Sequence, residues 1–83
     1  MITNDNLKCF IETIEIEDVK NAIDAPQDYI LLEAHIFNVG GYATIQSIDY
    51  NEDTEQEAND NGNLFLSKDD FLMLTTELEI FEF

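Results

Sequence analysis

Residues 29–50, YILLEAHIFNVGGYATIQSIDY, hold two strand-like runs separated by a glycine pair. The first run, residues 29–37, is rich in aliphatic and aromatic side chains, and the second, residues 42–50, begins by alternating aromatic or polar side chains with smaller or apolar ones. Runs of this kind between turn residues are typical of β-strands. The paired glycines in residues 38–41 supply the positive φ that a tight hairpin requires. The stretch predicts a β-hairpin at the centre of the fold.

Upstream of the hairpin, apolar side chains recur at helical intervals. They are Leu7, Phe10, Ile11 and Ile14, followed by Val19, Ala22 and Ile23. This spacing predicts a helix over residues 4–14 and helical structure, with a kink, as far as residue 24. Pro26 stops it, because the residue before a proline is pushed out of the helical region. Alternation around residue 15 leaves a strand over residues 9–17 as an alternative.

Downstream of the hairpin, residues 51–63 carry five carboxylates and no large hydrophobic side chain, which predicts a solvated acidic loop. Residues 64–66 predict a short third strand. Ser67 follows as the N-cap of a helix whose first turn is acidic. The apolar face of that helix consists of Phe71, Leu74, Leu78 and Phe81. A C-terminal strand over residues 77–83 is the alternative.

These elements predict one α+β domain over residues 1–83. Its small antiparallel sheet has about three strands with a central hairpin and packs against N-terminal and C-terminal helices. A chain of 83 residues has room for one modest hydrophobic core. No internal repeat indicates a solenoid.

Charge is the compositional feature that most constrains function. Nineteen carboxylates accompany three lysines and no arginine, for a formal net charge of −16, although 45% of the residues are hydrophobic. A disordered acidic tail lacks the apolar residues for a core, so the composition indicates a folded polyanion. Direct binding to nucleic acid or to an anionic membrane is not expected, because both depend on lysine and arginine to neutralise phosphate. The expected partners are basic surfaces.

The single cysteine, Cys9, cannot form an internal disulfide, which predicts a reducing, cytoplasmic location. A nucleophilic thiolate needs a cationic neighbour, and only Lys8 is near in sequence, so a small core residue is the favoured interpretation of Cys9. The N-terminus lacks the pattern of a signal peptide, and no apolar run has the length of a membrane span.

Motifs for chemistry are scarce, and the sequence predicts neither an enzyme nor a cofactor or metal site. His35 is the only histidine and lies in a predicted strand, where a packed or hydrogen-bonded side chain is favoured over a general base. Residues 49–53 place oxygen ligands at alternating positions, as the start of an EF-hand loop does. However, Thr54 stands where that loop needs glycine, and Asp60 replaces the closing glutamate.

The acidic residues form three candidate partner-binding groups, near the end of the first helix, in the acidic loop, and at the end of the last helix. Their members are Glu12, Glu15, Glu17 and Asp18; Glu52, Asp53, Glu55, Glu57 and Asp60; and Glu77, Glu79 and Glu82. In the third group, each carboxylate at the negative end of the helix dipole is disfavoured by about 0.3–1 kcal/mol. Selection for solubility alone would avoid that position. Carboxylates on successive helical turns lie about 5–6 Å apart, close to the phosphate spacing of a nucleic acid strand.

In charge, size and α+β character, the whole chain resembles DNA-mimic inhibitors, many of them phage or mobile-element proteins that block defence nucleases or nucleoid proteins. The resemblance includes no sequence motif. It implies a non-enzymatic inhibitor in the positively charged groove of a DNA-binding protein or nuclease, with Tyr42, Tyr50 or Phe83 as apolar anchors. The alternative is an accessory protein–protein interaction module whose acidity serves solubility. Phe81 and Phe83 also allow a homodimer seam.

Overall fold

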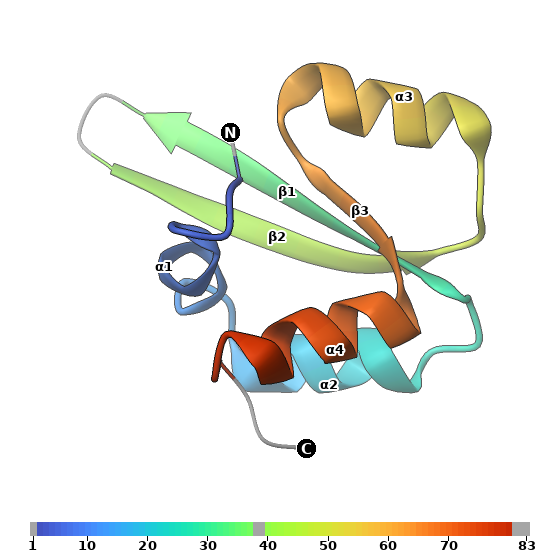
Figure 1. Ribbon diagram of the computed structural model, residues 1–83, viewed down its shortest axis with the longest axis horizontal. Helices are drawn as coiled ribbons and strands as arrows, with labels where there is room; N and C mark the ends of the chain where they lie inside the picture. Colours follow the sequence, from blue (N-terminus) through green and yellow to red (C-terminus); the bar gives the residue numbers. More distant parts are fainter. Residues whose placement is uncertain (1, 38–39, 81–83) are drawn as a thin grey trace.

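The computed structural model describes residues 2–37 and 40–80. It confirms the predicted α+β class: in these residues, four helices pack on a three-stranded antiparallel sheet of order β2-β1-β3 (Figure 1). The helices are α1 (Leu7–Ile11), α2 (Ile16–Asp24), α3 (Glu52–Asn61) and α4 (Lys68–Glu77), and the strands are β1 (Tyr29–Phe37), β2 (Gly40–Ile48) and β3 (Leu64–Ser67). None of these helices has the length and apolar character needed to cross a membrane.

The predicted hairpin is formed by β1 and β2, which pair antiparallel over the full length of both strands. The glycine pair belongs to β2 and not to the turn, so this strand lies two residues nearer the N-terminus than predicted; residues 38–39 lie outside the described part. Gly40 has a φ of 150°, which L-residues rarely adopt. At Gly41, a Cβ atom would lie 2.9 Å from the carbonyl oxygen of His35. Gly40 therefore permits an unusual backbone conformation, and Gly41 permits the close approach of the two strands.

The register divides the sheet into two faces, because side chains alternate across a strand. The core face carries Ile30, Leu32 and Ala43 and is covered by α1, α2 and α4. Its buried cluster comprises Leu7, Ile11, Val19, Ala22, Ile30, Leu32, Ala43 and Phe71. The opposite face carries Leu31 and is covered in part by α3. In Figure 1 the sheet accordingly separates α3 from α2 and α4.

The N-terminal segment is helical, as predicted, but it forms two helices instead of one kinked helix. After α1 ends, Thr13 lies in the break and its hydroxyl donates a 2.6 Å hydrogen bond to the carbonyl oxygen of Phe10. Glu15 then has extended backbone, with φ −66° and ψ 138°, at the N-cap of α2. The alternative strand over residues 9–17 does not form.

The acidic stretch after the hairpin is the helix α3, so the predicted loop over residues 51–63 is wrong. The side chain of Asn51 caps the helix by accepting hydrogen bonds from the backbone N–H groups of Asp53, at 2.9 Å, and Thr54, at 3.2 Å. Three acids in the first turn also favour the helix, because they lie at the positive end of its dipole. End effects thus stabilise a helix that hydrophobic periodicity did not predict.

A Schellman motif ends α3. Gly62 has a φ of 72°, and the N–H of Asn63 donates a 2.8 Å hydrogen bond to the carbonyl oxygen of Ala58. Ala58 is also the only buried residue of this helix. The helix is therefore fixed by its two caps and one small side chain, while the rest of its surface remains accessible.

Both β3 and α4 form as predicted. The hydroxyl of Ser67 accepts a 3.2 Å hydrogen bond from the N–H of Asp70, and this confirms the N-cap. The predicted apolar face packs on the core through Phe71, Leu74 and Leu78. The predicted fourth member, Phe81, lies outside the described residues, and no strand follows α4 as far as residue 80.

A second Schellman motif ends α4, but with a carboxylate-bearing residue at the glycine position. Glu79 has a φ of 57°, and the N–H of Ile80 donates a 2.8 Å hydrogen bond to the carbonyl oxygen of Thr75. A side chain in the left-handed region is less favourable than glycine. Glu79 therefore combines an unfavourable backbone conformation with an unfavourable position in the helix dipole.

Candidate partner-binding surface

The structure does not bring the three predicted acidic groups together into one surface. In the first group, Glu12 follows α1 and the other members lie at the start of α2. The second group lies entirely on α3. In the third group, Glu77 and Glu79 lie at the end of α4. Glu82 lies outside the described residues. Since α2 and α4 cover the core face and α3 covers the opposite face, the sheet separates the second group from the other two (Figure 1). The surface of α3 is therefore a candidate binding surface of its own.

The carboxylates of Glu52, Asp53, Glu55, Glu57 and Asp60 make up what we call the α3 array. Glu55 is half-buried and the others are exposed. Within the described residues, no lysine forms an ion pair with any carboxylate. Lys68 donates its ammonium hydrogen bond to the carbonyl oxygen of Ala25 instead. The negative charge of the α3 array is thus not neutralised by any lysine of the described residues.

The members of the α3 array differ in what they do for the helix. Glu52, Asp53 and Glu55 occupy the first turn, where the dipole favours them. Glu57 and Asp60 lie beyond that turn, and Asp60 accepts a 3.1 Å hydrogen bond from the side chain of Gln56. Helix stability therefore accounts for the first three positions but not for Glu57.

Aromatic side chains gather beside the start of α3. Tyr29 of β1 stacks on Phe65 of β3 with ring centroids 5.1 Å apart, and Tyr50 lies 5.1 Å from Tyr29 and 6.1 Å from Phe65. Tyr50 is 52% exposed. The carboxylate of Glu55 raises the pKa of Tyr50 above its ordinary value, with smaller contributions from desolvation and from Glu52. One of the three predicted anchors is therefore an exposed ring with carboxylates close by.

The two other predicted anchors have different outcomes. Tyr42 is 42% exposed and stacks on His35, with ring centroids 4.8 Å apart. Nε2 of His35 lies 3.2 Å from the hydroxyl oxygen of Thr44, so the interpretation of this histidine as a hydrogen-bonded strand residue is confirmed. Phe83 lies outside the described residues, so its anchor role stays a prediction.

Sequence reasoning missed an apolar pocket of about 410 Å³ beside the end of the hairpin. Its lining residues are Asn6, Cys9, Phe10, Thr13, Ile36, Gly40 and Gly41, none of them charged. Ile36 is 65% exposed there. Cys9 is also exposed, so its predicted core position is wrong: Leu7 and Ile11 direct α1 onto the core, and Cys9 points away from it. No pattern in the sequence predicts that α1 lies beside the end of the hairpin.

A second pocket, of about 200 Å³, lies between α3 and the sheet. It is lined by Leu31, Glu33, Thr54, Glu57, Ala58, Asn61 and Asn63. Asn63 also accepts a 3.1 Å hydrogen bond from the N–H of Ala34 through its side-chain oxygen. This pocket adds Glu33, which was not among the predicted residues, to the acidic surface around α3.

The described residues contain no group of three or more histidine, cysteine, aspartate or glutamate side chains that could hold a metal ion. The stretch with partial EF-hand spacing continues into a capped helix instead of a calcium loop. In that helix, successive carboxylates project around the axis rather than converging on one point.

Comparisons with known proteins identify no relative of this chain. No family model, no curated protein and no solved structure matches the chain. The features that bear on function are therefore its own: the α3 array, the aromatic cluster around Tyr50, and the apolar pocket at the hairpin end.

Proposed function

We propose that this protein is a non-enzymatic acidic binding domain that occupies the positively charged groove of a DNA-binding protein or nuclease, as a DNA-mimic inhibitor. The α3 array carries the proposal. Its carboxylates are accessible, are not neutralised by lysine in the described residues, and are held on a helix with a cap at each end. A preorganised charged surface loses less conformational entropy on binding than a flexible acidic loop.

The charge of the whole chain supports the same partner class. A protein of net charge −16 attracts cationic surfaces over long distances and repels nucleic acid, and this attraction weakens as salt increases. Side chains on successive turns of a helix have Cβ atoms about 5–6 Å apart, a spacing that suits lysine and arginine side chains arranged to contact successive phosphates. Electrostatic complementarity of this kind contributes mainly to the association rate and to specificity.

The test is affinity capture from bacterial lysate with the tagged protein, eluted by a salt gradient with and without excess duplex DNA. We expect one DNA-binding protein to be retained, released at moderate salt and displaced by DNA. A retained partner that is indifferent to DNA and to salt contradicts the proposal.

A matched pair of charge variants locates the binding surface. The triple variant Asp53→Asn, Glu57→Gln and Asp60→Asn removes three charges from α3. The control variant Glu12→Gln, Glu15→Gln and Glu17→Gln removes three charges on the other side of the sheet. We expect the α3 variant to reduce affinity for the captured partner far more than the control. Equal losses would mean that net charge, and not the α3 array, determines binding.

A second candidate function is an accessory protein–protein interaction module. The uncharged pocket beside Ile36 favours it, because exposed apolar side chains beside a pocket are typical binding anchors. In this case Ile36→Ser abolishes capture of a partner whose retention is insensitive to salt, while the α3 triple variant retains it.

A further inference from the structure

In the aromatic cluster near α3, Tyr50 is exposed to solvent and packs against the rings of Tyr29 and Phe65. Tyr29 and Phe65 stack with an interplanar angle of 23°, and both lie on the sheet face opposite the core. Tyr50 packs against this pair at interplanar angles of 54° and 35°. With two rings packed beside it and 52% of its surface exposed, Tyr50 offers an accessible aromatic ring, which we call the Tyr50 platform.

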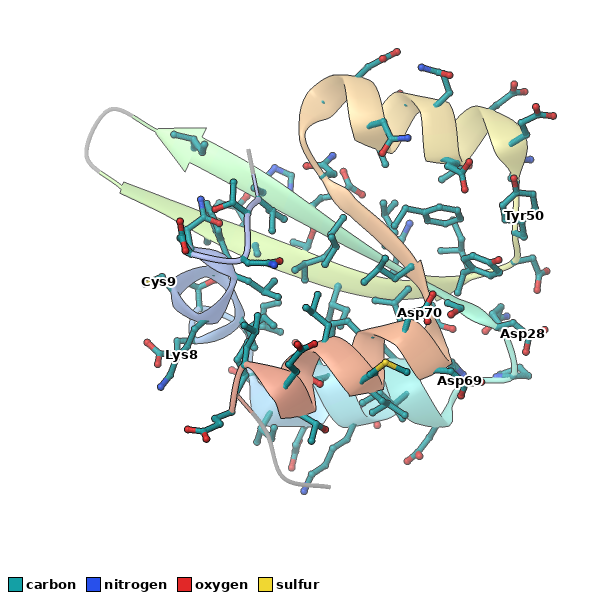
Figure 2. The ribbon with its side chains drawn as sticks, in the orientation of Figure 1. Lys8, Cys9, Asp28, Tyr50, Asp69 and Asp70 are labelled. Atoms are coloured by element: carbon teal, nitrogen blue, oxygen red, sulfur yellow. The ribbon has the colours of Figure 1, made fainter. Side chains whose placement is uncertain are left out.

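Negative charge lies beside this platform. The carboxylates of Glu55 and Glu52 act on the Tyr50 ring strongly enough to raise the pKa of its phenol. Figure 2 shows Asp28, the residue before Tyr29, at the same end of the molecule as Tyr50. The platform is therefore an exposed aromatic ring with carboxylates beside it.

None of the three lysines supplies a positive charge to the ring. Lys68 is engaged by the carbonyl oxygen of Ala25, and Lys8 lies on α1 at the opposite end of the molecule (Figure 2). Lys20 is on α2, which packs on the other side of the sheet. Within the described residues, the lysines therefore leave the exposed side of the ring open to a cation from another molecule.

We infer that the Tyr50 platform binds the guanidinium group of an arginine on the basic partner, with Glu52 and Glu55 as the flanking carboxylates. The inference rests on the proposed function, since it names the side chain that anchors the same partner. Arginine fits better than lysine because its planar, weakly hydrated group stacks on aromatic faces and binds carboxylates through a rigid set of donors. Arginine is also a major phosphate-contacting residue of DNA-binding surfaces.

The test is calorimetric titration of the intact protein with a nona-arginine peptide and with a nona-lysine peptide at one ionic strength. Tyr50→Leu removes the ring and keeps an apolar side chain, whereas Tyr50→Phe keeps the ring. Met73→Ala is the control, because Met73 is also an exposed apolar side chain but lies on α4, on the other side of the sheet. We expect Tyr50→Leu to weaken nona-arginine binding about two- to fivefold and nona-lysine binding less. Tyr50→Phe and Met73→Ala should bind as the unchanged protein does.

A measurement on the unchanged protein covers the case in which Tyr50→Leu impairs folding. Ring protons of Tyr50 should shift on addition of nona-arginine, and arginine side-chain protons should move upfield. No shift at Tyr50, or an equal loss of affinity in Met73→Ala, overturns the inference.

The outcomes separate this inference from the proposed function. If Tyr50→Leu binds nona-arginine normally while the α3 triple variant loses the captured DNA-binding protein, the inference that Tyr50 binds arginine is wrong and the mimic proposal stands. If no DNA-displaceable partner is captured but the Tyr50 effects on nona-arginine persist, the platform is right and the mimic proposal is wrong.

Discussion

The hydroxyl of Thr13 accepts a 2.9 Å hydrogen bond from the backbone N–H of Ala43. Ala43 lies in β2, an edge strand of the sheet, and is buried. An edge strand leaves backbone groups without a strand partner, and here the break between α1 and α2 supplies one. The residue in the break between the N-terminal helices therefore supplies a hydrogen-bond acceptor to one N–H group of the sheet edge.

Replacing Thr13 with valine should lower the free energy of unfolding by about 1–3 kcal/mol, because the N–H of Ala43 then loses its acceptor in a buried setting. Urea unfolding followed by circular dichroism measures the change. Thr13→Ser keeps the hydroxyl and should recover most of the stability. If serine and valine are equally destabilising, the hydrogen bond to Ala43 is not the cause.

Replacing Asn51 with alanine should destabilise α3 by about 0.5–2 kcal/mol, since two N–H groups of the first turn lose their acceptor. Hydrogen exchange at the amides of Asp53 and Thr54 reports the effect directly. Asn59→Ala is the control within the same helix and should be neutral or slightly stabilising, because alanine has the higher helix propensity. Equal acceleration in both variants would contradict a capping role for Asn51.

Substitutions at the positive-φ residues of the two Schellman motifs should change the stability of the protein in opposite directions. Gly62→Ala introduces a side chain at a positive φ and should lower stability by about 1 kcal/mol. Glu79→Gly removes such a side chain together with an unfavourable carboxylate, and should raise stability by about 1–2 kcal/mol. Thermal unfolding compares them. Glu79→Gln removes only the charge, so a gain equal to that of glycine would assign the whole effect to electrostatics.

The pKa of Tyr50 should lie above its ordinary value of 10.0, and Glu55→Gln should lower it. In the unchanged protein, the raised pKa means that the folded state holds the phenolic proton more tightly than the unfolded state does. The free energy of unfolding should therefore fall as the pH rises from near 10 through the folded-state pKa. An NMR titration of the Tyr50 ring measures the pKa. Glu57→Gln is the matched control, and an equal shift in that variant would remove Glu55 as the principal cause.

Local sequence signals predicted the parts of the fold that depend on local chemistry. The hairpin strands followed from their composition, and α4 followed from the Ser67 cap and the apolar spacing after it. The failure at α3 has a physical reason: a helix that buries only Ala58 has no hydrophobic period to detect. Asn51 and Gly62 were the available signals, one at each end, and both are also common in loops.

The candidate site was only partly predictable for a different reason. The acidic residues were evident from composition, but their separation by the sheet depends on topology. Tyr29, Tyr50 and Phe65 come from three separate segments, and the strand register determines that they meet. Cys9 was misplaced because the short helix α1 has only Leu7 and Ile11 buried.

The construction of α3 also affects how this protein can change during evolution. Ala58 is the one side chain through which the helix joins the interior, and its ends are fixed by Asn51 and Gly62. Most of the other positions can vary in charge and size without disturbing the cluster beneath α1, α2 and α4. The charge and shape of the α3 surface can therefore change during evolution while the scaffold stays the same.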